Sequence, residues 1–461
     1  MEENQGMVEK FFHLKKNNTT VKTEFIAGLT TFMTMAYILA VNPSILSAAG
    51  MDKGAVLTAT ALASMLGTLA MAFMANYPFA LAPGMGLNAY FAYTVVLQMG
   101  YSWQMALGAV FVEGVIFIVL SLTSVREAIF NAIPLSLKRA VSVGIGLFIA
   151  FIGLLNAKII VANPATKVSL FSFKASLSSG NFNSEGIAVL LAILGILFTA
   201  ILMTKRVKGD ILWGIVFTWI CGMLCETAGL YVPNPKLGMF STFPNLSQGF
   251  MPASLTPIMG HLDFSKFFTF DFVVVIFAFL FVDLFDTLGT LIGVATKADM
   301  LDENGKLPRI RGALLADSLA TCAGAVLGTS TTTTFVESAS GVAAGGRTGL
   351  ASVFTALFFG LSLFFSPFFL AIPAFATTPA LVMVGFLMVS TVAQIDFTDL
   401  SESIPAYIAI IAMPFSYSIS EGISFGVISY VVINILCGKT SKISPLMYIL
   451  AILFIGKYIF L

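Results

Sequence analysis

The sequence predicts an all-α polytopic membrane protein whose fourteen transmembrane segments form two inverted repeats of seven. Three observations support this fold class. The 461 residues are 58% hydrophobic and only 10% charged, whereas a soluble domain is about one quarter charged. Long stretches contain no charged residue at all. In addition, each half of the chain has a polar, Gly- or Pro-rich interruption at a similar distance from its first apolar span.

The charge-free windows locate the segments, because one span needs roughly 20 apolar residues. They cover 25–51, 54–112, 140–157, 186–204, 318–336, 348–395 and 403–420. The longer windows hold two or more spans each. Apolar runs and turn signals place the segment centres near residues 31, 64, 90, 112, 148, 195, 218, 280, 319, 341, 361, 385, 411 and 429. Residues 444–461 remain as a short apolar tail.

Basic residues predict the side of the membrane that each connection faces. If residues 1–22 are cytoplasmic, most Lys and Arg residues fall on cytoplasmic segments, which is the usual bias. These are Lys10, Lys15, Lys16, Lys22, Arg126, Lys138, Arg139, Lys205, Arg206, Lys208, Lys297, Lys306, Arg309, Arg311, Arg347, Lys439 and Lys442. Residues 157–185 and 231–269 then form external loops. Because residues 1–22 have no apolar signal-peptide region, we expect the first span to direct its own insertion into a bacterial inner membrane.

The two interruptions predict broken transmembrane segments. They read ALAPGMGLNAYFAY (80–93) and GTSTTTTFVESASGV (328–342). Pro83 and the neighbouring glycines prevent a continuous helix in the first, and STTTTFV (330–336) prefers a strand in the second. Unwound backbone inside a membrane needs hydrogen-bond partners. We therefore expect two short strands that face each other, each followed by a half-helix that begins near 87–89 or near 337–338.

Broken segments at matching positions of two inverted repeats are typical of a transporter's binding site, because the positive ends of both half-helices converge on one spot. The alternative is that the small residues only allow close helix packing. A paired interruption favours the binding site.

Acidic residues inside the apolar windows are site candidates, because a charge at the bilayer centre costs at least about 2.5–3.5 kcal/mol. FVDLFDTLGT (281–290) places Asp283 and Asp286 on one helical face, and Glu337 lies in the second interruption. Three neighbouring carboxyls do not all stay ionised cheaply, so the group can carry a proton with a substrate. For Asp286 a structural hydrogen bond is an equal alternative.

Other acids have weaker claims. Glu113 has an apolar surround and is expected to support Asn88 or the helix ends. Asp317 and Glu226 lie near expected span ends, so we interpret both as structural.

The sequence also excludes several classes of protein. No P-loop, G-x-S-x-G or catalytic triad pattern is present, so we expect neither an enzyme nor a cofactor. His13 and His261 lie in polar segments, and the four cysteines have no metal-ligand spacing, so we expect no metal site. A net charge of +1 without basic blocks gives no nucleic-acid footprint.

Four stretches resemble the AzgA-like hypoxanthine, adenine and guanine permeases of the nucleobase:cation symporter group, which also contains the uracil and xanthine permeases. They are TEFIAGLTTFMTMAYILAVNPSIL (23–46), APGMGLNAYFAYTV (82–95), FVDLFDTLGTLIGVA (281–295) and ESASGVAAGGRTGLASV (337–353). The resemblance implies a uracil-permease-like fold with a core domain (23–125 and 270–373) and a gate domain (126–230 and 374–461), separated by the loop 231–269. It also implies that segments 3 and 10 each contain a short strand, and related folds often form homodimers.

The resemblance assigns substrate-site roles to Asn88, Asp283 and Glu337, with Asp286 as a nearby coupling or structural acid. On this interpretation Glu337 binds one purine edge, Asp283 binds another or holds the coupling proton, and Asn88 orients base and acids. Groups at Ala89, Phe335, Val336 and Ser338 complete the site, and Glu113, Thr287 and Thr334 support it. Phe279, Phe335 or Tyr90 is a candidate to cover the ring face.

The expected function is therefore proton-coupled import of a purine base by an elevator or rocking motion. The uracil-type branch has a histidine in segment 8, and here no histidine lies in any expected span. This departure argues against a uracil or xanthine permease. An anion transporter of the same general fold is a further alternative, although it would favour basic or backbone groups over three acids.

Overall fold

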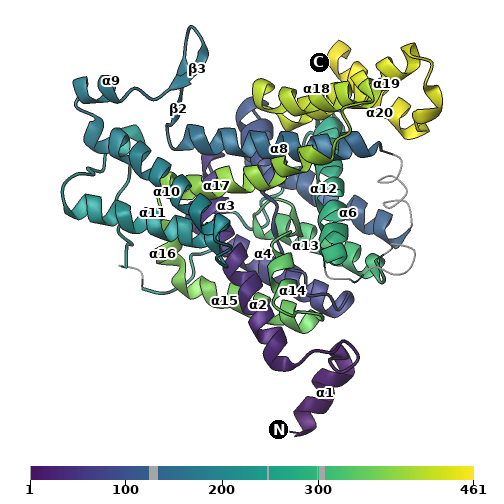
Figure 1. The fold of residues 1–461 in the computed structure, drawn as a ribbon, viewed down its shortest axis with the longest axis horizontal. Helices are drawn as coiled ribbons and strands as arrows, with labels where there is room; N and C mark the ends of the chain where they lie inside the picture. Colours follow the sequence, from purple (N-terminus) through teal and green to yellow (C-terminus); the bar gives the residue numbers. More distant parts are fainter. Residues whose placement is uncertain (1, 124–132, 247–248, 298–299, 301–306, 461) are drawn as a thin grey trace.

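The computed structural model describes residues 2–123, 133–246, 249–297, 300 and 307–460. These residues are mostly helical (Figure 1). Among them, ten helical stretches are long and apolar enough to cross a membrane: Val21–Ala48, Lys53–Met74, Trp103–Leu122, Leu135–Asn156, Phe182–Thr204, Asp210–Thr227, Ile310–Leu327, Gly349–Ala371, Ala374–Gln394 and Ile419–Leu436. The chain is therefore a multi-pass membrane protein.

The first half of the chain runs from α1 to α11. Its elements are α1 (Glu2–Phe12), α2 (Val21–Met35), α3 (Ile38–Ala48), α4 (Lys53–Met74), β1 (Leu81–Pro83), α5 (Met85–Ala89), a π-helix (Tyr90–Gln98), α6 (Trp103–Leu122), α8 (Leu135–Asn156), β2 (Ile160–Asn163), β3 (Lys167–Leu170), α9 (Phe173–Ser178), a π-helix (Phe182–Gly186), α10 (Ile187–Thr204) and α11 (Asp210–Thr227). Side-chain caps begin several of these helices; for example, Asp52 accepts a 2.7 Å hydrogen bond from Ala55 N–H at the start of α4.

The second half runs from α12 to α20. A 3-10 turn (Pro235–Leu237) precedes it, and its elements are α12 (Phe270–Lys297), α13 (Ile310–Leu327), β4 (Thr332–Thr334), α14 (Ser338–Ala343), α15 (Gly349–Ser362), a 3-10 turn (Leu363–Phe365), α16 (Ser366–Ala371), α17 (Ala374–Val389), a 3-10 turn (Ser390–Gln394), α18 (Leu400–Ser416), α19 (Ile419–Leu436), a 3-10 turn (Thr440–Lys442) and α20 (Pro445–Phe460). The apolar tail is thus a helix, and it packs against α19.

The helices pack into two sets. In the first set, α13 packs against α4 and α6, and α15 packs against α2 and α4. In the second, α8 packs against α17 and α18, α10 packs against α11 and α17, and α18 packs against α19. Smaller contacts join the sets, among them those of α5 and α12 with α8. In Figure 1, α8 and α17 run side by side across the molecule, and α6, α12 and α13 lie together at its right.

The two expected short strands are present and pair with each other. β1 and β4 are antiparallel, with Leu81 opposite Thr334 and Pro83 opposite Thr332. The pairing continues beyond the strands, because Gly84 N–H donates to Thr331 C=O (3.0 Å) and Phe335 N–H donates to Ala80 C=O (2.9 Å). Unwound backbone at this depth therefore has partners within the protein. The pairing joins the two halves of the chain at their centre.

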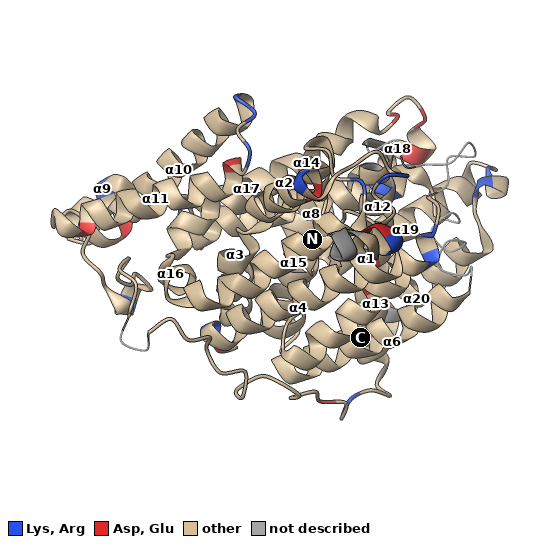
Figure 2. Ribbon diagram, turned by 90° about the horizontal axis from the view of Figure 1, so that it is seen from below, with Lys and Arg blue, Asp and Glu red and all other residues tan. Residues whose placement is uncertain are grey.

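Charged residues lie mainly at helix ends and in connections, while the bodies of most helices contain none (Figure 2). The expected external loop 157–185 contains a hairpin, β2 and β3, and the helix α9. The topology prediction also used Arg126 and Lys306, which lie outside the described residues.

Candidate functional site

The half-helices begin where the two strands end. Pro83 ends β1, Gly84 takes an extended conformation, and α5 starts at Met85, two residues earlier than expected. The difference arises because the Gly84 carbonyl already accepts the Asn88 N–H (2.8 Å), which closes the first helical turn. On the other side, Glu337 directly precedes α14, as the sequence indicates.

Glu337 lies half-buried at the start of α14. Its Oε1 accepts a 2.7 Å hydrogen bond from the Tyr37 hydroxyl. Tyr37 lies between α2 and α3 and is 1% exposed. A carboxylate can accept about four hydrogen bonds, so the bond from Tyr37 orients Glu337 and leaves acceptor capacity for a ligand.

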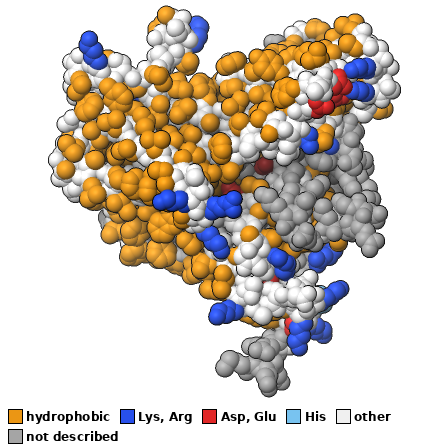
Figure 3. Space-filling view, in the orientation of Figure 1, with side chains coloured by type: hydrophobic (Ala, Val, Ile, Leu, Met, Phe, Trp, Pro, Cys, Tyr) orange, Lys and Arg blue, Asp and Glu red, His pale blue; other side chains and the backbone are white. Residues whose placement is uncertain are grey.

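Asp286 is the second half-buried acid. It interacts electrostatically with Asp283 and Glu337, and Glu337 also interacts with Asp210 at the start of α11. Asp286 lies close to Gly84, because a Cβ placed on Gly84 would be 3.3 Å from Asp286 Oδ2. Glu337 and Asp286 are thus the two accessible acids near the starts of the half-helices. Figure 3 shows acidic atoms at the bottom of a hollow near the middle of the molecule, with Lys and Arg side chains at its rim.

Asp283 differs from these two acids because it is 0% exposed. Its Oδ1 accepts a 2.8 Å hydrogen bond from the Thr287 hydroxyl. Thr287 also lies 3.1 Å from both carboxyl oxygens of Asp317 and 2.6 Å from the Thr333 hydroxyl of β4. Asp283 therefore belongs to a buried polar cluster behind the accessible acids, which we call the Thr287 cluster: Asp283, Thr287, Asp317 and Thr333.

The position expected for Asp317 was wrong. The residue lies in the body of α13, not near the end of a span, and it is 0% exposed. The sequence is misleading here because several charged residues lie close together before position 312 and the charge-free window opens only at 318, directly after Asp317. This pattern indicates that Asp317 marks the end of a span, whereas the helix already begins at Ile310. Glu226, in contrast, lies at the end of α11, where its carboxylate accepts hydrogen bonds from Ser241 and Thr242.

Asn88 lies in α5 and Glu113 lies in α6. Both are 0% exposed. Asn88 accepts a hydrogen bond from the Ser330 hydroxyl, and Glu113 accepts one from the Thr331 hydroxyl (2.7 Å). Both side chains therefore bond to the segment that leads into β4.

The remaining candidates are divided between buried and exposed positions. The Ser338 hydroxyl accepts the Ala80 N–H (3.0 Å), so it joins α14 to the start of β1. Val336 is 48% exposed, whereas Ala89, Thr334 and Phe335 are buried. Tyr90 and Phe279 pack edge to face at 4.7 Å between ring centroids.

Sequence reasoning missed Tyr37, Thr333 and the position of Asp317. Tyr37 is one tyrosine in an apolar window, and Thr333 is one of four consecutive threonines. Neither residue is marked by the sequence around it, because its hydrogen-bond partner is distant in the chain. The partner of Tyr37 is about 300 positions away and that of Thr333 about 46.

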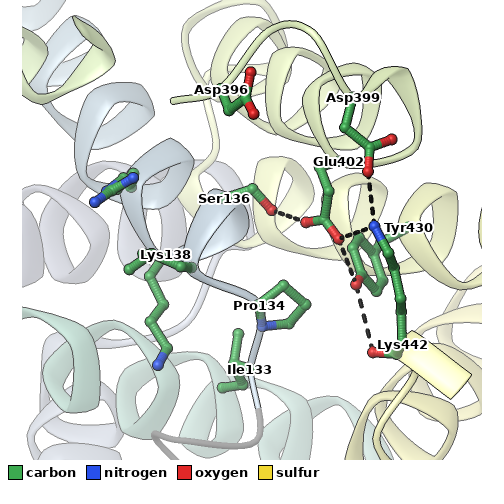
Figure 4. A pocket seen from close by; sticks show the side chains of 11 residues that line it. Ile133, Pro134, Ser136, Lys138, Asp396, Asp399, Glu402, Tyr430 and Lys442 are labelled. Carbon is green, nitrogen blue, oxygen red and sulfur yellow. Dashed lines mark hydrogen bonds and ion pairs between the residues drawn. The ribbon is translucent and has the colours of Figure 1, made fainter. Parts of the chain in front are cut away.

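A separate cavity of about 720 Å³ lies at the ends of α8, α18 and α19. Ser136, Asp399, Glu402, Tyr430 and Lys442 line it and bond to one another across it (Figure 4). The carboxylates of Asp399 and Glu402 are thus used in ion pairs, and that of Asp396 accepts hydrogen bonds from Thr398. Glu337 and Asp286 remain the stronger candidates for the functional site, because Glu337 directly precedes α14 and Asp286 lies beside Gly84 at the start of α5.

Comparison with solved structures supports the fold. The transmembrane domain of the cyanobacterial bicarbonate transporter BicA matches with a TM-score of 0.63 and 15% identity, covering 88% of this chain and 97% of that one. SLC26A9 matches with a TM-score of 0.64 and 11% identity, covering 94% and 69%. At such identities the likeness concerns the fold alone.

Comparison with known sequences identifies the family. A family model described as "Permease family" (Xan_ur_permease) matches residues 22–425. The adenine permease AdeP of Escherichia coli is 44% identical over 99% of this chain and 97% of its own length. The guanine/hypoxanthine permeases PbuO and PbuG of Bacillus subtilis are 45% and 46% identical, covering 96% and 98% of this chain and 98% and 100% of theirs. The chain therefore belongs to this permease family, as the motifs around the two interruptions and α12 indicated, and it is a transporter and not an enzyme.

Proposed function

We propose that this chain imports purine nucleobases, namely hypoxanthine, guanine or adenine, across the cytoplasmic membrane together with protons. The single observation that supports it best is the pair of accessible acids, Glu337 and Asp286, near the starts of the two half-helices that follow the paired strands. The names of the relatives, which are adenine and guanine/hypoxanthine permeases, agree with this substrate class.

A purine base is flat, neutral and edged with ring N–H donors and acceptors. Glu337, held by Tyr37, can accept N–H groups from one edge of the base. The first N–H groups of α5 have no partner within the helix and are suited to a 6-oxo group or a ring nitrogen. Asp283 is buried in the Thr287 cluster, so we assign it to the coupling proton and not to the base.

We further propose that the first helix set is a mobile core and the second a gate, within fourteen segments of two inverted repeats. In support, each set has its own extensive packing, and the site lies on the core elements where α5 and α12 contact α8. An elevator motion of the core along the gate would expose the site to each side in turn. The N-terminus is cytoplasmic on this proposal, because α1 and its following turn contain Lys10, Lys15 and Lys16.

An anion transporter is the second candidate, favoured only by the fold of BicA and SLC26A9. Among the described bases, Arg347 contacts the end of α14, where its guanidinium donates to the Val342 and Gly346 carbonyls (2.8 Å each). It therefore caps the end of α14, as expected for a positive charge at a helix C-terminus. The accessible acids favour a neutral N–H donor over an anion.

Uptake of labelled hypoxanthine, guanine and adenine by cells without their own purine permeases tests the proposal. We expect uptake that a protonophore abolishes, and loss of uptake in Glu337→Gln and Asp283→Asn. Glu185→Gln, at an ion pair with Lys158 far from the site, is the matched control. Unchanged, protonophore-insensitive uptake in both site variants would exclude the coupling, and uptake of sulfate or bicarbonate in place of purines would exclude the substrate.

A further inference from the structure

The π-helix Tyr90–Gln98 makes polar contacts between the two helix sets. It continues α5 and packs against α3 and α6, so it belongs with the first set. The Asn156 side-chain amide, at the end of α8, donates to the Tyr93 hydroxyl at 3.1 Å. The Gln98 side-chain amide donates to the Ser416 carbonyl, at the end of α18, at 3.3 Å. Because α8 and α18 belong to the second set, both bonds cross the interface between the sets.

Tyr417 packs beside these two bonds. It lies between α18 and α19 in a left-handed conformation, with a φ of 56°, which residues other than glycine rarely adopt. Its ring packs edge to face against Tyr93 at 6.1 Å between centroids and against Phe148 of α8 at 5.3 Å. Such distances are typical of favourable aromatic pairs. The ring of Tyr417 therefore contacts both helix sets.

The π-helix explains why Tyr93 and Gln98 both face the second set. They are five residues apart, and in an α-helix such side chains would lie about 140° apart around the axis. In a π-helix each N–H bonds to the carbonyl five residues earlier, as the Met99 N–H does to the Thr94 carbonyl (2.9 Å). Residues five apart then lie on one side, as residues four apart do in an α-helix. The wider turn thus allows one short segment to contact α8 and α18 together.

These contacts lie at the helix ends that are remote from the basic residues. Asn156 is the last residue of α8, whereas Lys138 and Arg139 lie near its start. Tyr417 lies just before α19, whereas Lys439 follows the other end of that helix. On the proposed orientation the contacts are therefore external. Figure 3 shows acidic atoms at the bottom of a hollow with Lys and Arg side chains at its rim, which indicates that the site opens on the opposite, basic side.

We propose that Tyr93, Gln98 and Tyr417 form a latch that closes the external side of the purine site and must open before a base enters from outside. The two hydrogen bonds and the aromatic contact all break when the first set moves along the second. Loss of one neutral hydrogen bond shifts such an equilibrium about two- to tenfold. The inference rests on the proposed function for the ligand and for the orientation of the chain.

Thiol labelling measures the opening of the latch without any transport. Val336→Cys, in a background without the four native cysteines, is the probe, because Val336 is 48% exposed and directly precedes Glu337. A membrane-impermeant maleimide is added to intact cells, which present the external side, and to inside-out vesicles. We expect slow labelling in intact cells. The rate should rise about fivefold or more when Tyr93→Phe and Gln98→Ala are combined, because both hydrogen bonds are then lost.

Two further variants complete the labelling experiment. Tyr231→Phe is the matched control, because the Tyr231 hydroxyl donates to the Phe240 carbonyl away from the interface, and it should leave the labelling rate unchanged. Tyr417→Leu removes the aromatic contact but neither hydrogen bond, and it should also raise labelling in intact cells. Unchanged labelling in both latch variants would overturn the proposal. A rise confined to inside-out vesicles would also overturn it, since the contacts would then close the cytoplasmic side.

Uptake then tests the role of the latch in transport. When only a fraction of the protein is open to the outside, the apparent affinity for an external ligand is reduced by that fraction. The combined variant should therefore lower the KM for external hypoxanthine by about the factor by which labelling rises, whereas simple misfolding would lower only the maximal rate. An unchanged or higher KM would contradict the role of the latch in substrate entry. If wild type moved no purine, the proposed function would fail while the labelling result stood on its own.

Discussion

At the residue scale, the site depends on contacts that hold two acids in place. Tyr37 fixes Glu337 by one hydrogen bond, and the absence of a side chain at Gly84 leaves room for Asp286 and Thr333 beside the start of α5. Both contacts join segments that are far apart in the chain. Each can be removed by a change of one or a few atoms.

Tyr37→Phe removes only the hydroxyl that donates to Glu337. A hydrogen bond to a charged group contributes about 1.5–3 kcal/mol, so we expect the KM for purine uptake to rise about tenfold or more with little change in protein level. Tyr231→Phe is the control, because Tyr231 donates to the Phe240 carbonyl (2.8 Å) away from the site. An unchanged KM in Tyr37→Phe would show that Tyr37 does not position Glu337.

Gly84→Ala adds one Cβ, which would lie 2.7 Å from Thr333 Cγ2, 3.1 Å from Leu87 Cδ1 and 3.3 Å from Asp286 Oδ2. Overpacking typically costs about 1–3 kcal/mol, so we expect uptake to fall about tenfold or more. Gly456→Ala in α20 is the matched control, since its Cβ would meet nothing within 4 Å. Normal uptake by Gly84→Ala would mean that this close approach is not needed.

At the element scale, side chains from one segment cap helices of another. The Glu24 carboxylate of α2 is 0% exposed and accepts the N–H groups of Arg347 (2.9 Å) and Ala351 (3.1 Å), so it caps α15. A carboxylate at a helix N-terminus is favoured by the helix dipole. This contact joins α2, near the start of the chain, to α15 in its second half.

Asp399 caps α18 by the same principle, and it also pairs with lysines. Lys442 donates to it at 2.7 Å, Ser401 Oγ at 2.7 Å and Lys439 at 3.1 Å. These bonds hold the pKa of the Asp399 carboxyl well below its usual 3.8. A lowered folded-state pKa stabilises the protein above the unfolded pKa, and this stabilisation disappears as the pH falls through the folded one.

Asp399→Asn retains a capping oxygen but loses the charge. We expect the variant to have a lower Tm than wild type near neutral pH. The Tm difference between the two proteins should narrow as the pH falls below about 4, which is the pKa of Asp in the unfolded state. High salt should also narrow this Tm difference, because salt screens the exposed ion pairs of Asp399 with Lys439 and Lys442. Asp52→Asn at the α4 cap tests capping alone. If the Tm difference stayed constant down to about pH 2, where strongly paired carboxylates begin to be protonated, the ion pairs would not contribute to stability.

At the scale of the whole molecule, the proposed transport requires the two helix sets to move past each other. α5 and α8 meet at Gly86, where a Cβ would lie 4.0 Å from Ile145 Cβ. This separation is within the range of a disulfide, about 3.5–4.5 Å. A covalent bond here would hold the sets in one relative position.

The pair Gly86→Cys and Ile145→Cys, in a background without Cys221, Cys225, Cys322 and Cys437, tests the motion. We expect oxidation to abolish uptake and a reductant to restore it. The controls are the two single variants, Gly86→Cys and Ile145→Cys, each in the same background and treated with the same oxidant, because neither can form the bond between α5 and α8. Oxidised Gly86–Ile145 protein that still transports at the wild-type rate would contradict a relative motion of the two sets.

The sequence by itself determined the class of protein, the positions of the broken segments and which acids inside the apolar windows are candidates for the site. Apolar composition requires a membrane, proline and consecutive threonines prevent regular helices, and a charge in an apolar window is costly wherever the fold places it. These are local properties, so they can be read without the structure. For the same reason, β1, β4 and the start of α14 lie where the pattern indicated them.

Only the tertiary structure decided which acids are accessible and which are buried. Asp283 and Asp286 are three residues apart on one helix, yet the first faces Thr287 and Asp317 of the interior while the second is half-buried near Gly84. Tyr37 likewise meets Glu337 only because α2, α3 and α14 pack together. Burial and hydrogen-bond partners depend on residues hundreds of positions away, and no local pattern specifies them.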